Sequence, residues 1–94
     1  LYERILRDFH GRFVNEAVMI RQALAEGDRD SAQRGAHSTK GLAGSIGAHD
    51  LQTASLALEQ AIEANTPDLE SCLNHYAVAL ATVTSGIASG FNLT

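Results

Sequence analysis

The chain has 94 residues, and 7 Lys and Arg side chains against 11 Asp and Glu side chains give it a net charge of −4. This length leaves room for one compact domain, and an apolar fraction of 45% is ordinary for a globular core. An acidic chain without Trp argues against a nucleic-acid binder, which needs a basic surface with stacking side chains. A single Cys rules out an internal disulfide and suits a reducing compartment.

Apolar residues recur every three or four positions in four blocks, which is the spacing of amphipathic helices, and no strand pattern competes with them. The first predicted helix ends at Gly27, a residue type that accepts the left-handed conformation found after helices. Gly11 is a position at which this helix could be kinked or divided. Its apolar stripe consists of Tyr2, Leu6, Phe9, Phe13, Ala17, Ile20 and Leu24.

The second and third predicted helices are bounded by recognisable end signals. Asp28 is the expected N-cap of the second helix, and Gly47 is its expected stop. The third helix runs to a break at Asn65. Their apolar stripes are Ala32, Ala36, Thr39, Ala43 and Ile46 in the second helix, and Leu51, Ala54, Leu58 and Ile62 in the third.

The fourth predicted helix has Thr66 as its N-cap, Pro67 at its first helical position and Asp68 in its first turn. We expect it to fray at Gly90 and residues 91–94 to be loosely held. Because the connections are short, successive helices are antiparallel neighbours, and residues 1–94 are predicted to form one all-α domain, an antiparallel up-and-down four-helix bundle. The apolar stripe of the fourth helix is Leu69, Leu73, Tyr76, Leu80, Val83 and Ile87.

The second predicted helix has a composition that core packing does not explain. The segment from His37 to Gly44 contains Lys40 and two glycines, and Gly35 lies just before it. Each glycine inside a helix costs about 0.5–1 kcal/mol relative to Ala. A small domain is not expected to carry three of them without some return.

At about 100° per residue, His37 points about 20° from Gly44 and about 40° from Gly41, whereas the apolar stripe lies roughly 140° away. Lys40 and Arg34 each lie about 60° from His37. This face therefore presents an exposed imidazole beside a cation, with space for the backbone of another protein. The alternatives are that His37 and Lys40 are ordinary solvated residues and that the glycines serve close helix packing.

The segment from Ala36 to Ala48 resembles the signature of the histidine-containing phosphotransfer (HPt) domain family. That signature is Ala-His-x-aliphatic-Lys-Gly, a stretch of small residues and Gly-Ala, and Leu51 and Leu58-Glu59 continue the pattern on the next helix. Thr39 departs from it, because the family usually has an aliphatic residue there. This position faces the core, where a threonine hydroxyl can bond to a carbonyl of the preceding turn.

The resemblance implies that His37 accepts a phosphoryl group from an aspartyl phosphate on a receiver domain and passes it to the Asp of another receiver. The attacking nitrogen, expected to be Nε2, must be exposed with a free lone pair while Nδ1 carries the hydrogen. Glu59 is the candidate acceptor for that hydrogen, because it lies about 80° off the third apolar stripe and family members have Glu or Gln there. Lys40 is expected to stabilise the phosphoryl oxygens.

The resemblance also implies how a receiver would approach. Gly41 and Gly44 would admit its active-site loops, and Gln33, Arg34 and Ser45 are expected rim contacts. The receiver is expected to hold the Mg²⁺ that phosphoryl transfer needs, so this chain is predicted to have no cofactor or metal of its own. The expected partners are response-regulator receiver domains, without nucleic acid or direct membrane contact, and the isolated domain is expected to be a monomer.

The first residue is Leu1 rather than Met, and we expect a module cut from a longer protein, such as a hybrid sensor histidine kinase. The longest purely apolar run, residues 76–81, is too short to span a membrane. The domain is therefore expected in the cytoplasm, as part of a parent protein that could be anchored in the inner membrane.

An alternative from another class is a helical interaction module that binds a partner without phosphotransfer. A kinase or phosphatase is disfavoured, because the sequence has no nucleotide-binding glycine loop or metal-carboxylate cluster, and we expect a phospho-carrier rather than an enzyme. His10, His49 and His75 have no metal-like spacing. Cys72 is expected to be a small packed hydrophobe.

Overall fold

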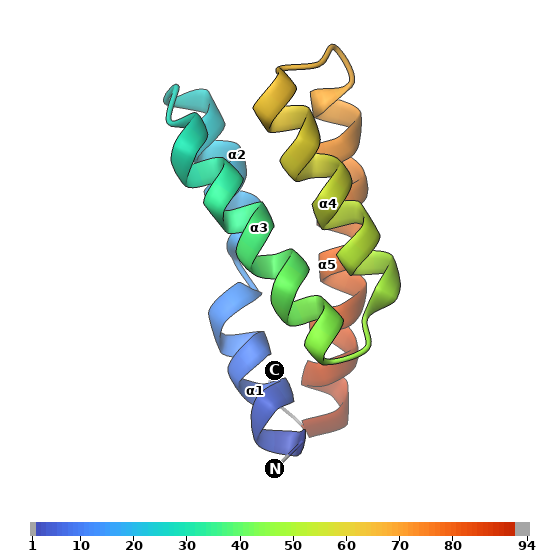
Figure 1. The fold of residues 1–94 in the computed structure, drawn as a ribbon. Coiled ribbons are helices and arrows are strands. Elements are labelled where there is room, and N and C mark those ends of the chain that lie inside the picture. The colour runs from blue at the N-terminus through green and yellow to red at the C-terminus, as the bar shows by residue number, and fades with distance from the viewer. Residues whose placement is uncertain (1, 92–94) are drawn as a thin grey trace.

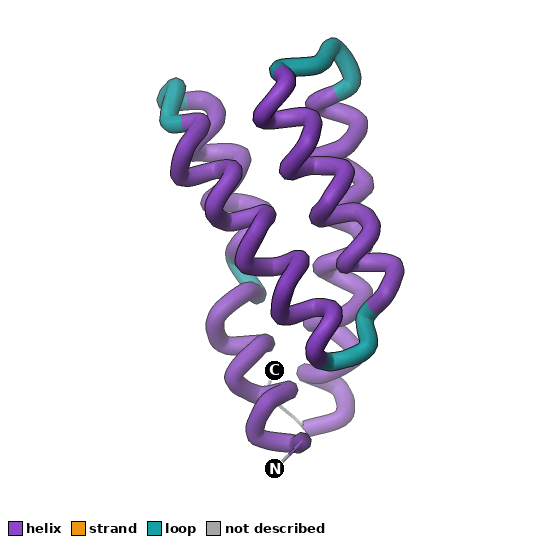
Figure 2. Tube along the Cα trace, in the orientation of Figure 1, coloured by secondary structure: helices purple, strands orange, loops and turns teal. Residues whose placement is uncertain are grey.

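The computed structural model describes residues 2–91, which form a bundle of helices without any strand (Figures 1 and 2). Two consecutive segments, α1 and α2, take the place of the first predicted helix, so the chain passes up and down the bundle four times (Figure 1). The predicted all-α four-helix bundle is therefore confirmed. The helices are α1 (Tyr2–Phe13), α2 (Glu16–Ala25), α3 (Arg29–Ser45), α4 (His49–Ala64) and α5 (Leu69–Phe91).

The division of the first predicted helix falls at Val14 and Asn15, whereas Gly11 lies inside α1. The expectation that Gly11 would divide it was wrong. Val14 is β-branched and Asn15 is a residue type that competes with helical hydrogen bonding, so this pair is a weaker point than a single glycine.

The predicted helix ends between the other elements are confirmed. Gly27 and Gly47 have φ values of +80° and +78°, and Asn65 has a φ of 52°, so all three adopt the left-handed conformation that closes a helix. The Asp28 side chain accepts a hydrogen bond from the Ser31 amide at 3.2 Å, as an N-cap should.

The start and the end of α5 differ from the prediction. Pro67 and Asp68 lie in a turn, which the Leu69 amide closes by donating to the Thr66 carbonyl at 3.2 Å. The helix begins only after this turn, and the Asp68 carbonyl accepts from the Cys72 amide at 2.9 Å. At its other end, α5 continues past Gly90 to Phe91, which packs against the core, so the helix has not frayed there. Residues 92–94 lie outside the described part.

The four apolar stripes meet in one core, with one exception at its margin. Tyr2 is 56% exposed, and its hydroxyl donates to the Ile46 carbonyl at 3.1 Å, so it caps the end of α3 instead of packing inside. The large side chains of the core come mainly from α4 and α5, and α3 adds small ones. The buried residues of α3 are Ala32, Ala36, Thr39 and Ala43.

The α3–α4 pair has the most extensive helix contact in the structure. Small residues on α3 allow this close approach, which brings the outer edges of the two helices within side-chain reach. Among residues 2–91, no helix combines the length and the apolar character that crossing a bilayer requires.

Candidate functional site

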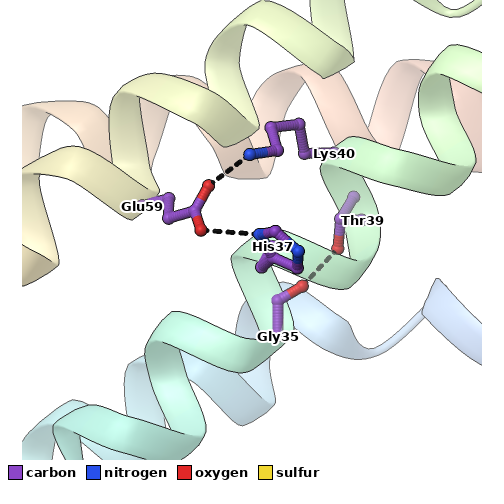
Figure 3. Close-up of polar contacts among 5 residues, drawn as sticks. All are labelled: Gly35, His37, Thr39, Lys40 and Glu59. Carbon is purple, nitrogen blue, oxygen red and sulfur yellow. Dashed lines mark hydrogen bonds and ion pairs between the residues drawn. The ribbon is translucent and has the colours of Figure 1, made fainter.

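His37 projects from the outer surface of α3 toward α4, and its side chain is 66% exposed (Figure 3). The helix presents it outward because Ala36 and Thr39, its neighbours on the buried face, are fully covered by the core. The predicted orientation of this histidine is thus the one observed.

Glu59 of α4 joins His37 to Lys40 (Figure 3). Its Oε2 atom lies 2.7 Å from His37 Nδ1, and its Oε1 atom accepts from Lys40 Nζ, also at 2.7 Å. An ionised carboxylate can only accept hydrogen bonds, so Nδ1 carries the hydrogen. In the neutral imidazole, Nε2 then has a free lone pair on the exposed edge of the ring.

The Glu59 carboxyl is well suited to stay ionised. Its side chain is only 14% exposed, and this burial alone would raise its pKa. The hydrogen bonds and positive charge of Lys40, together with the His37 contact, outweigh burial and lower the pKa below its ordinary value. Glu59 therefore remains a hydrogen-bond acceptor for both partners at neutral pH.

Lys40 is partly covered, with 26% of its side chain exposed, and its ammonium group points at Glu59. The predicted role of this group is to meet negative charge that arrives at His37. An ammonium group has three hydrogens, and the bond to Glu59 uses one of them. The remaining hydrogens can bind an incoming anion without breaking the ion pair.

An open hollow of about 540 Å³ lies beside the imidazole. Of the predicted rim residues, Gln33 and Arg34 line it, whereas Ser45 does not. Arg34 is exposed and donates to the Ser31 hydroxyl at 3.2 Å, and the Ser45 hydroxyl donates to the Gly41 carbonyl at 3.3 Å.

Sequence reasoning missed Asp30 and Ser38, which also line this hollow. Asp30 lies seven residues before His37 and so shares its helical face, a spacing that could have identified it. Contacts of any of these side chains with a partner stay predictions.

The three glycines of α3 differ in their surroundings. A Cβ atom at Gly41 would meet nothing within 4 Å, so this position is open. A Cβ at Gly44 would lie 2.5 Å from Gln52 Nε2 of α4, and one at Gly35 would lie 2.8 Å from Glu16 Oε1 of α2. A Cβ at Gly35 or Gly44 would thus displace a side chain of a neighbouring helix, whereas Gly41 leaves open surface near His37.

Thr39 is fully buried directly behind the site. Its hydroxyl donates to the Gly35 carbonyl at 2.8 Å, as predicted for a buried threonine (Figure 3). The same oxygen lies 2.8 Å from the Tyr76 hydroxyl of α5, a contact that the sequence did not predict.

The other histidines lie apart from this site. His49 and His75 are exposed and His10 is half-buried. No three His, Cys, Asp or Glu side chains within residues 2–91 are grouped as metal ligands. Cys72 is partly buried, and burial, with Asp68 nearby, raises the pKa of its thiol, which disfavours the reactive thiolate.

A comparison with protein-family models finds the Hpt domain over residues 4–86. Searches of curated proteins and of solved structures returned no match. Hpt domains are phosphocarrier modules of phosphorelay signalling, distinct from kinases, and they interact with the receiver domains of response regulators. With this match over most of its length and the helical bundle that such domains form, the chain belongs to the Hpt domain family.

Proposed function

We propose that His37 is the residue that carries the phosphoryl group between receiver domains. Its Nε2 atom attacks the phosphorus of an aspartyl phosphate in line. The N–P bond forms as the bond from phosphorus to the aspartate oxygen breaks, and the aspartate leaves as a carboxylate. The reverse step on a second receiver transfers the group onward and returns the neutral imidazole.

The observation that carries this proposal is the Glu59 contact at Nδ1. It selects the ring form in which the exposed Nε2 atom is the nucleophile. As Nε2 bonds to phosphorus, the ring acquires positive charge, and the carboxylate stabilises that charge through the Nδ1 hydrogen. Glu59 therefore favours the phosphorylated state as well as the reactive tautomer.

Lys40 supports the same reaction through its charge. A phosphoryl group brings about −1.5 to −2 charge at neutral pH, and Lys40 lies one helical turn from His37. No acidic cluster for a metal is needed on this chain, because the receiver supplies the Mg²⁺ and the aspartate. Gly41 leaves room for the receiver's loops.

The experiment is transfer of labelled phosphate from a phosphorylated receiver to the domain. Wild-type protein should acquire an acid-labile label, as expected for an N–P bond, and His37→Gln should acquire none. His49→Gln and His75→Gln are matched controls, since both histidines are exposed and neither lines the hollow beside His37. Labelling of His37→Gln at the wild-type level would contradict the proposal.

Binding measurements distinguish phosphotransfer from a purely docking role. His37→Gln should still bind the receiver while failing to transmit phosphate. If a phosphorelay rebuilt with this variant still transmitted its signal, the domain would be an interaction module. Transfer profiling against the receivers of the source organism would then identify the donor and acceptor.

A further inference from the structure

The fully buried side chains of α3 are small. Apart from Thr39, its fully buried residues are alanines. Alanine offers one methyl group, and contacts between apolar groups have no preferred direction. A hydrogen bond on this face would therefore fix the rotation of α3 about its axis more sharply than the alanine contacts do.

The Thr39–Tyr76 contact supplies a direction that the alanines lack. Both residues are 0% exposed, and their oxygens lie 2.8 Å apart. Thr39 has a single hydroxyl hydrogen, which goes to the Gly35 carbonyl, so Tyr76 is the donor of the bond to Thr39. Burial raises the pKa of the Tyr76 phenol, so the group keeps its hydrogen.

Within the described residues, few hydrogen bonds join α3 to other helices. Arg29 at the first position of α3 donates to the Ile62 carbonyl, His37 and Lys40 reach Glu59, and Thr39 meets Tyr76. At the other end of α3, the Tyr2 hydroxyl of α1 donates to the carbonyl of the C-cap residue Ile46. Of these, the Thr39 contact is fixed inside the core and stands between the two site residues in the sequence. A 20° rotation of α3 would move an atom about 6 Å from the helix axis by about 2 Å, enough to break a hydrogen bond at Glu59.

We infer that the buried Thr39–Tyr76 hydroxyl pair is a positioning device for the transfer site. It sets the rotation of α3 at which His37 Nδ1 and Lys40 Nζ both reach the Glu59 carboxylate. Neither hydroxyl touches the phosphoryl group. The kinetic consequence of this inference rests on the proposed function, whereas its geometric consequence does not.

The test compares Thr39→Val and Tyr76→Phe, which each remove a hydroxyl and keep nearly the same shape. Thr39→Ser keeps the hydroxyl and should therefore keep the properties that Thr39→Val loses. Thr84→Val is the matched control, because Thr84 is also a buried threonine but bonds only within α5, to the Leu80 carbonyl at 3.0 Å. The ¹⁵N chemical shifts of the His37 ring report its tautomer, and label transfer from a phosphorylated receiver reports the rate.

Loss of either hydroxyl should convert the single His37 tautomer into a mixture and slow transfer by about 10- to 100-fold, because small misplacements of reacting groups are costly. Thr84→Val and Thr39→Ser should keep the wild-type shifts and rate. Wild-type shifts in both Thr39→Val and Tyr76→Phe would overturn the inference, as would equal changes in Thr84→Val. If Thr39→Val does not fold, Tyr76→Phe decides the question.

The two proposals fail in different ways. Label uptake by His37→Gln would remove the proposed function but leave the tautomer measurement valid. Normal uptake by wild type, with unchanged shifts and rate in Tyr76→Phe, would remove only the positioning role.

Discussion

Gly41→Ala is expected to make the protein more stable and a poorer phosphate carrier. Gly41 is exposed and lies inside α3, and an added Cβ would meet nothing within 4 Å. The methyl group therefore reduces the entropy cost of the helix without a clash. An exposed helical Gly→Ala change gains about 0.5–1 kcal/mol, which raises the melting temperature of a domain this size by about 2–8 °C.

The same methyl group is expected to hinder the approach of the receiver domain. The new methyl group would stand one turn from His37, on surface that the receiver's loops need. A displacement of about 1 Å at the reacting atoms slows a reaction by about 100-fold, so we expect transfer to slow by about tenfold or more.

Gly86→Ala is the matched control for this experiment. Gly86 is also exposed, lies inside the long helix α5 and has no neighbour within 4 Å of an added Cβ. Thermal unfolding should show a similar gain for both variants, whereas label transfer should slow only for Gly41→Ala. A stabilised Gly41→Ala that transfers phosphate at the wild-type rate would refute the assignment of this surface to the partner.

Three further predictions concern stability. Leu58→Ala should lower the free energy of unfolding, measured by chemical denaturation, by about 2–5 kcal/mol, and Leu56→Ala should lower it much less. The reason is that Leu58 is 0% exposed and Leu56 is 41% exposed. Equal losses would mean that the core is misassigned. For Glu59, burial alone would raise the pKa, but Lys40 and His37 lower it below the ordinary value. The contribution of this carboxylate to stability is therefore present above about pH 4.5 and is lost as the pH falls through the folded pKa. In acid unfolding curves, Glu59→Gln should lack this pH-dependent loss of stability. For Glu16, burial raises the pKa against the opposing charge of Arg12, so the carboxylate destabilises the fold as the pH rises through the folded pKa. The free energy of unfolding of Glu16→Gln, relative to that of wild type, should therefore be larger at pH 7 than at pH 4. The reverse order would contradict this reasoning.

Much of the fold follows from local sequence signals. Apolar stripes located the helices, and Asp28, Gly27 and Gly47 marked their boundaries through backbone chemistry that needs no tertiary information. Some errors were local, such as the position of the first break and the start of α5, and one came where a distant residue decides. Tyr2 fits the first stripe, yet the free carbonyl of Ile46 at the end of α3 holds it at the surface.

The site divides in the same way. The direction of His37 and its pairing with Glu59 could be predicted because both follow from helical faces and antiparallel neighbours. The different surroundings of the three glycines could not, since they depend on whether a particular side chain, such as Gln52 opposite Gly44, fills the space. The hydrogen bond between Thr39 and Tyr76 likewise depends on how α3 and α5 are offset along their axes, which apolar periodicity does not specify.

The break between α1 and α2 separates a helix that is less tightly packed, α1, from the rest of the bundle. α1 packs mainly on α5, while α3 and α4, which carry the site, pack chiefly on each other. Opening α1 would therefore expose few of the contacts that hold the site together. Amide hydrogen exchange is expected to be fastest in α1 and slowest where α3 and α4 pack together. Local unfolding of α1 would then leave the position of His37 unchanged.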